Sequence, residues 1–115
     1  MTDKLYDLKK IIEISSGDDN FVREMVVTFV ENVTDEIENI EQLKKNENWT
    51  TIAEISHKLV SNYAYLGADD LRTTAADIEK SVVVDHRFDE IAEKATYLCN
   101  HSKTLINKLK VDFNI

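Results

Sequence analysis

The stretch of sequence that decides the fold is WTTIAEISHKLVSNYAYLG, residues 49–67. Six of its side chains recur at steps of three or four residues, as side chains do along one face of an α-helix. They are Trp49, Ile52, Ser56, Leu59, Tyr63 and Leu66. The stretch therefore predicts an amphipathic helix that buries this stripe and ends near Gly67.

One residue of this helix, His57, is not explained by helix packing. At about 100° per residue, it falls at the border of the stripe and turns toward solvent. The residues that share its strip of surface all have short side chains. They are Thr50, Ala53, Val60, Ser61 and Ala64. An imidazole ring in such surroundings is open to another macromolecule, which is how a nucleophile offered to a protein partner should look.

Similar helical patterns extend on both sides of this stretch. Apolar residues recur at helical spacing from Leu5 to Ile12, from Phe21 to Ile40, from Leu71 to Val82 and from Ile91 to Leu109. Outside the first pattern, the residues expected to face inward are Phe21, Met25, Phe29, Val33, Ile37, Ile40, Leu71, Thr74, Ala75, Ile78, Val82, Ile91, Ala95, Leu98, Ser102, Leu105 and Leu109.

Polar residues and two glycines separate these patterns. Gly17 suits a left-handed helix end, Asp18 or Asp19 suits the N-cap of the next helix, and Asn48 suits the N-cap of the helix that carries His57. The absence of proline points to an all-α protein. Short connections favour antiparallel neighbours. We therefore expect an antiparallel up-down four-helix bundle, with an additional N-terminal helix packed across one end.

The bulk properties narrow the function. A chain of 115 residues predicts one domain, residues 1–115. Its net charge of −8, without a basic patch, argues against nucleic-acid binding. It has no apolar run of membrane-spanning length and no signal or lipidation motif, so we expect a soluble, cytoplasmic protein. The single cysteine, Cys99, excludes an internal disulfide and is expected to be a small buried side chain.

Several kinds of catalytic site find little support. Two isolated glycines cannot form a phosphate-binding loop, so we expect no ATP site. Ser56 and His57 are adjacent and point about 100° apart on a helix, which argues against a hydrolytic triad. Glu54 and His57 form one Glu-x-x-His step of the kind found in di-iron bundles, but the other two histidines lack a glutamate at that spacing. We therefore expect no metal site.

The segment from His57 to Gly67 resembles the signature of histidine-containing phosphotransfer (HPt) domains. That family places a leucine two positions after its histidine, here Leu59, and a glycine ten positions after it. Ala68 follows, as alanine often does in the family. Residues 17–21, GDDNF, resemble the family's Gly-Asp-x-x-Phe element, and residues 67–79 resemble its Gly-x-x-x-Leu and Leu-Glu positions. The match spans nearly the whole chain in the family's order.

The resemblance implies a phosphoryl carrier rather than an enzyme. His57 would accept a phosphoryl group, at Nε2, from a receiver-domain aspartate and pass it to another receiver. The chain itself would need no cofactor, because Mg²⁺ is expected in the partner receiver. The partners implied are receiver domains and a hybrid histidine kinase, and we expect a monomer. The expected receiver-docking face consists of Thr50, Ala53, Lys58, Val60, Ser61, Ala64 and Gly67.

The chain departs from the family pattern one turn after the histidine. The family commonly has lysine three positions after the histidine and glycine at the fourth, where this chain has Val60 and Ser61. Lys58 projects about 100° away around the helix and is a poor substitute. A neutral hydrogen bond from Ser61 is weaker than a charge-assisted one. A second hypothesis is therefore a degenerate adaptor that docks receivers or kinases without transferring the phosphoryl group.

Overall fold

The computed structural model describes residues 5–115, and all regular secondary structure in that range is α-helical. The helices are α1 (Lys9–Ser15), α2 (Asp19–Lys45), α3 (Trp49–Tyr65), α4 (Asp69–Val83) and α5 (Ile91–Phe113). The prediction of an all-α chain is confirmed. The first helix is shorter than its pattern indicated: Leu5 and Leu8 lie before it. Within α1, only Ile11 is buried.

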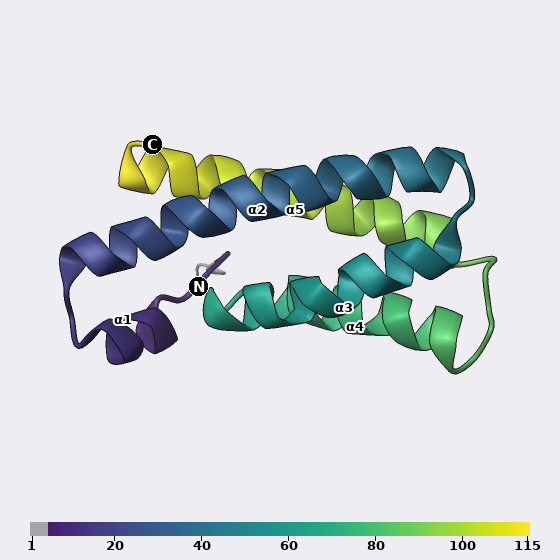
Figure 1. The fold of residues 1–115 in the computed structure, drawn as a ribbon, viewed down its shortest axis with the longest axis horizontal. Helices are drawn as coiled ribbons and strands as arrows, with labels where there is room; N and C mark the ends of the chain where they lie inside the picture. Colours follow the sequence, from purple (N-terminus) through teal and green to yellow (C-terminus); the bar gives the residue numbers. More distant parts are fainter. Residues whose placement is uncertain (1–4) are drawn as a thin grey trace.

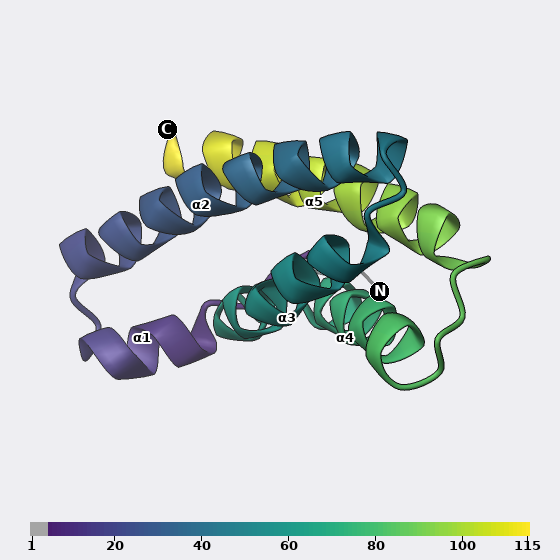
Figure 2. The same ribbon diagram turned by 45° about the vertical axis from the view of Figure 1, so that its right-hand side comes forward.

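The helices pack in two pairs (Figures 1 and 2). One layer holds α2 and α5, and the other holds α3 and α4, with consecutive helices from α2 to α5 running in alternating directions. Contacts join α2 to α3, α3 to α4, α4 to α5 and α5 back to α2, so these four helices form a closed ring. The short α1 contacts α2 and lies at the end of the molecule where α3 ends. No helix of the described chain is long and apolar enough to cross a bilayer.

Side-chain caps set where α2 and α3 begin. The carboxylate of Asp18 accepts hydrogen bonds from the backbone N–H groups of Asn20 and Phe21, at 3.0 and 3.2 Å. The side chain of Asn48 accepts one from the N–H of Thr51 at 3.3 Å. Each cap satisfies N–H groups that have no partner within the helix. The predictions for Asp18 and Asn48 are confirmed.

The stripe that begins at Trp49 lies against the core. Ile52, Ser56, Leu59 and Tyr63 are fully buried. The Tyr63 hydroxyl is hydrogen-bonded to Ser102 Oγ, which joins α3 to α5 inside the ring. The inward-facing residues expected on the other helices are buried or half-buried with one exception: Phe21 is 42% exposed.

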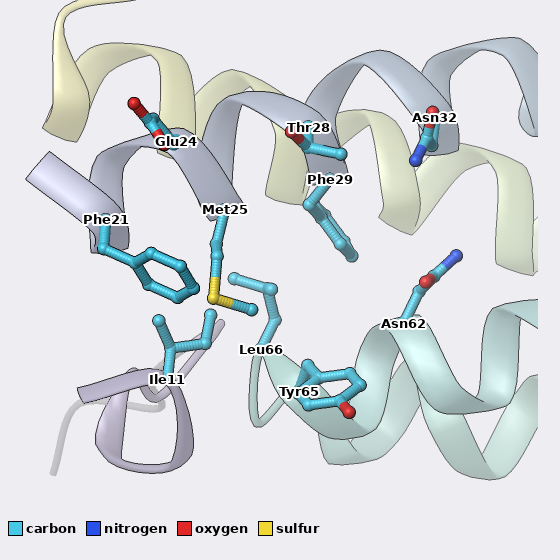
Figure 3. Close-up of a pocket in the computed structure, with 10 residues that line it drawn as sticks. All are labelled: Ile11, Phe21, Glu24, Met25, Thr28, Phe29, Asn32, Asn62, Tyr65 and Leu66. Atoms are coloured by element: carbon cyan, nitrogen blue, oxygen red, sulfur yellow. The ribbon is translucent and has the colours of Figure 1, made fainter. Parts of the chain in front are cut away.

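Phe21 is exposed because the beginning of α2 reaches beyond the α3–α4 pair (Figure 1). Its ring lines an open hollow of about 300 Å³ between α1, α2 and the end of α3. Ile11, Met25 and Leu66 point into this hollow, with the Tyr65 ring at its edge (Figure 3). The helical period of α2 therefore continues past the helices that could bury this side of it.

Candidate functional site

The exposed side of α3 carries His57, whose side chain is 70% exposed. Its Nδ1 lies 2.7 Å from Oε2 of Glu79 on α4. Ile78, the neighbour of Glu79, is fully buried in the core, which fixes the rotation of α4. The Glu79 side chain therefore emerges at the α3–α4 boundary, beside the imidazole ring.

The contact with Glu79 determines which ring nitrogen is free. An ionised carboxylate can only accept a hydrogen bond, so the neutral ring donates its proton from Nδ1. Nε2 then keeps an unshared electron pair. That nitrogen belongs to a largely exposed ring, so a partner can reach it from solvent. A neutral imidazole nitrogen with a free electron pair is a competent nucleophile.

An open hollow of about 450 Å³ lies beside the ring, between α3 and α4. Ala53 and Val83 contribute apolar side chains to its lining. The full set of lining residues is Thr50, Ala53, Glu54, His57, Lys58, Glu79 and Val83. His57 therefore lines a shallow depression between two helices and does not stand alone on the surface of α3.

The residues expected on the docking face differ in their accessibility. Thr50, Lys58 and Ser61 are exposed, while Val60 and Ala64 are half-buried. Gly67 is half-buried as well, and Ala53 is buried.

Ala53 is only 2% exposed, although it lines the depression beside His57, and its part in docking stays a prediction. The reason for its low exposure is the packing of α4 against this side of α3, because Glu79 and Val83 of α4 line the depression together with Ala53.

Gly67 lies away from His57, at the turn between α3 and α4. Ten residues of helix span about 15 Å. Its φ of +63° is left-handed, and a Cβ built there would lie 2.7 Å from both Cβ and the backbone oxygen of Asp7. The N–H of Asp7 also donates to the carbonyl of Leu66 at 2.7 Å. The structure gives Gly67 a role in joining the N-terminal segment to the end of α3.

Val60 packs against the core, so it supplies no positive charge where the family commonly has lysine. Within residues 5–115, neither Arg23 nor Arg72 supplies that charge in its place. Arg23 donates to the backbone carbonyls of Phe113 and Asn114, where α5 ends. Arg72 pairs with Asp69, 3.7 Å away on its own helix. Lys58 is the cation among the residues that line the depression.

The other two histidines have different surroundings. His86 lies in the exposed connection between α4 and α5, with a φ of +52°. The ring of His101 stacks on Tyr97 at 3.8 Å, and its Nδ1 lies 3.0 Å from the Tyr97 carbonyl. Within residues 5–115, no group of three His, Cys, Asp or Glu side chains is placed to hold a metal ion.

Two residues of the site were not assigned to it from the sequence. Glu79 ends the segment that resembles the family's Leu-Glu position, and Val83 follows the last residue of the helical pattern from Leu71 to Val82. Both belong to α4, about 22 to 26 positions further along the chain. Their position beside the ring depends on how α3 and α4 are paired, which helical periodicity does not report.

Comparison with known proteins gives one match. A protein-family model described as "Hpt domain" matches residues 24–109, about three quarters of the chain. The matched region includes most of α2, all of α3 and α4, and most of α5, so it contains both His57 and Glu79. The search of curated proteins and the search of solved structures found no match.

Proposed function

The chain belongs to the Hpt domain family, and on that basis we propose that it is a phosphorelay intermediary whose phosphoryl acceptor is His57. Hpt domains are phosphocarrier modules of two-component systems that interact with receiver domains and histidine kinases. In this proposal, His57 takes a phosphoryl group from the aspartate of one receiver and passes it to another. The protein acts as a cytoplasmic monomer, and Mg²⁺ belongs to the partner receiver.

The observation that carries the proposal is the 2.7 Å contact between His57 Nδ1 and Glu79 Oε2. The electron pair of Nε2 forms the new N–P bond while the bond from phosphorus to the aspartyl oxygen breaks, which leaves the aspartate as a carboxylate. Positive charge develops on the ring as Nε2 is phosphorylated. The Glu79 carboxylate balances that charge through the Nδ1 proton. The reverse reaction returns the phosphoryl group to a receiver.

The arrangement of helices supports this use. We interpret α2–α5 as an up-down four-helix bundle with α1 packed across one end, because the four helices alternate in direction and close a ring of contacts. A ring held on packed helices needs little reorganisation when a partner arrives. The partner can then supply the metal ion and most of the charge stabilisation.

The proposal predicts that His57→Gln abolishes phosphoryl transfer. The protein is incubated with radiolabelled, phosphorylated receiver domains encoded beside it, and label on each protein is followed in time. His101→Gln is the matched control, because it makes the same change at another exposed helical histidine. We expect label on the wild type and on His101→Gln, and none on His57→Gln. If no such receiver labels the wild type, the transfer proposal fails.

A specific observation favours one alternative, a degenerate adaptor that docks receivers or kinases without transfer. Val60 stands where the family commonly has lysine, and it packs against the core. The adaptor predicts receiver binding that survives His57→Gln, with no phosphohistidine on the wild type. The labelling experiment, combined with a binding measurement on the same variants, separates the two functions.

A further inference from the structure

The depression beside His57 contains an apolar surface that the phosphoryl chemistry does not use. Val83, at the last turn of α4, is 60% exposed and lines this depression. Ala53 and Thr50 line it as well. Together with Glu54, Lys58 and Glu79, these residues form an apolar surface with charged neighbours, the kind of surface that marks a protein interaction site.

We propose that this depression receives an apolar side chain of the receiver domain that exchanges the phosphoryl group with His57, so that Val83 is a docking residue. The inference rests on the proposed function, and it adds a contact that selects the partner. The phosphoryl group and the apolar side chain would come from the same protein surface.

The occupant follows from the shape of the site. The His57 ring is one wall of the depression, so a protein that brings phosphorus to Nε2 must also lie over its mouth. A specific interface covers about 800 Å² on each partner, which is far more than one imidazole ring. Thr50 and Val83 therefore fall within the area that the donor protein covers.

The charges around the depression favour an apolar occupant over a charged one. Glu79 already accepts from His57, while Glu54 and Lys58 carry opposite charges among the lining residues. A charged side chain seated on Ala53 and Val83 would lose water over two side chains that offer it no hydrogen bond. The arriving phosphoryl group is itself anionic and meets a chain of net charge −8. Burial of apolar surface is thus the attraction that this part of the site can offer.

The test separates docking from chemistry by using two phosphoryl donors. One is a phosphorylated receiver domain, and the other is phosphoramidate, a small molecule that needs no protein surface. The variant is Val83→Glu, with Val83→Thr as a nearly isosteric second change. Val111→Glu is the matched control, because Val111 is 78% exposed on the last turns of α5, in the other layer of the bundle.

We expect phosphoramidate to label wild type, Val83→Thr and Val111→Glu at similar rates, and Val83→Glu about twofold more slowly, because its added carboxylate repels the anionic donor. Transfer from the receiver at subsaturating concentration should fall about tenfold for Val83→Glu and less for Val83→Thr, with a matching weakening of receiver binding. Val111→Glu should behave as wild type.

Two results overturn the inference while leaving the proposed function intact. In the first, Val83→Glu receives label from the receiver as fast as Val111→Glu. In the second, both donors are slowed equally, which would show that the substitution disturbs His57 itself. If the wild type takes label from neither donor, the proposed function fails and the docking inference fails with it.

Discussion

At the scale of single residues, the carboxylate of Glu79 gives the two nitrogens of His57 different roles. Oε2 lies 2.7 Å from Nδ1, so one nitrogen is occupied by the protein and the other is left for a partner. A histidine without such a contact exchanges its proton between the two positions. The interaction therefore orients the ring and selects its tautomer before any partner binds.

We predict that Glu79→Gln slows phosphorylation of His57 by phosphoramidate about tenfold. The glutamine oxygen can still accept from Nδ1, but a neutral acceptor balances the developing charge less well. Glu54→Gln is the control, because it removes the same charge from the lining of the same depression without a recorded contact to the ring.

Nitrogen NMR of the His57 ring provides a second measurement for these variants. The wild type and Glu54→Gln should show the Nδ1–H form, while Glu79→Gln should show a larger share of the Nε2–H form. Equal slowing in the two variants would instead assign the effect to the overall charge of the depression.

At the scale of secondary-structure elements, the turn from α3 to α4 depends on Gly67. Its left-handed φ and its closeness to Asp7 both require the absence of a side chain. The hydrogen bond from Asp7 N–H to the Leu66 carbonyl lies at the same place. The N-terminal segment is thereby attached to the end of the helix that carries His57.

We predict that Gly67→Ala lowers the free energy of unfolding by about 2–3 kcal/mol, from backbone strain plus displacement of Asp7. Gly17→Ala is the control, because Gly17 has a similar φ of +79° but nothing within 4 Å of an added Cβ. It should cost only the strain, about 1 kcal/mol. Urea unfolding followed by helical circular dichroism measures both, and equal losses would contradict the role given to Asp7.

At the scale of the whole molecule, the closed ring of four helices shields Cys99. Cys99 lies on α5 and is 2% exposed. Its Sγ lies 3.9 Å from the backbone oxygen of Ile37 on α2. Burial raises the pKa of this thiol to about 11. Because the thiolate is the reactive form, the folded protein presents neither the access nor the ionisation that thiol reagents need.

We predict that an aromatic disulfide reagent at pH 8 labels Cys99 only as fast as the molecule opens. Ile37→Val, which removes one buried methylene, should accelerate labelling about fivefold through a loss of about 1 kcal/mol of stability. The measurement is the release of the coloured thiol with and without urea. Rapid labelling of the wild type in buffer, at the rate of the urea-unfolded chain, would show that the bundle does not protect its core.

Local patterns in the sequence were sufficient to predict the helices and the exposure of His57. The three- and four-residue spacing predicted the buried stripe of α3, and the polar residues Asp18 and Asn48 predicted where α2 and α3 begin. These features depend on the 3.6-residue period and on hydrogen bonds within one turn, so they can be read from neighbouring residues.

Tertiary packing decided what surrounds the ring. It brought Glu79 to Nδ1, covered Ala53 with α4, placed Val83 at the mouth of the depression and set Asp7 against Gly67. The sequence by itself determined that this chain forms helices and turns one histidine outward. Only the paired helices decided which nitrogen of that histidine is free, because a contact between α3 and α4 depends on their register, which no pattern within either helix contains.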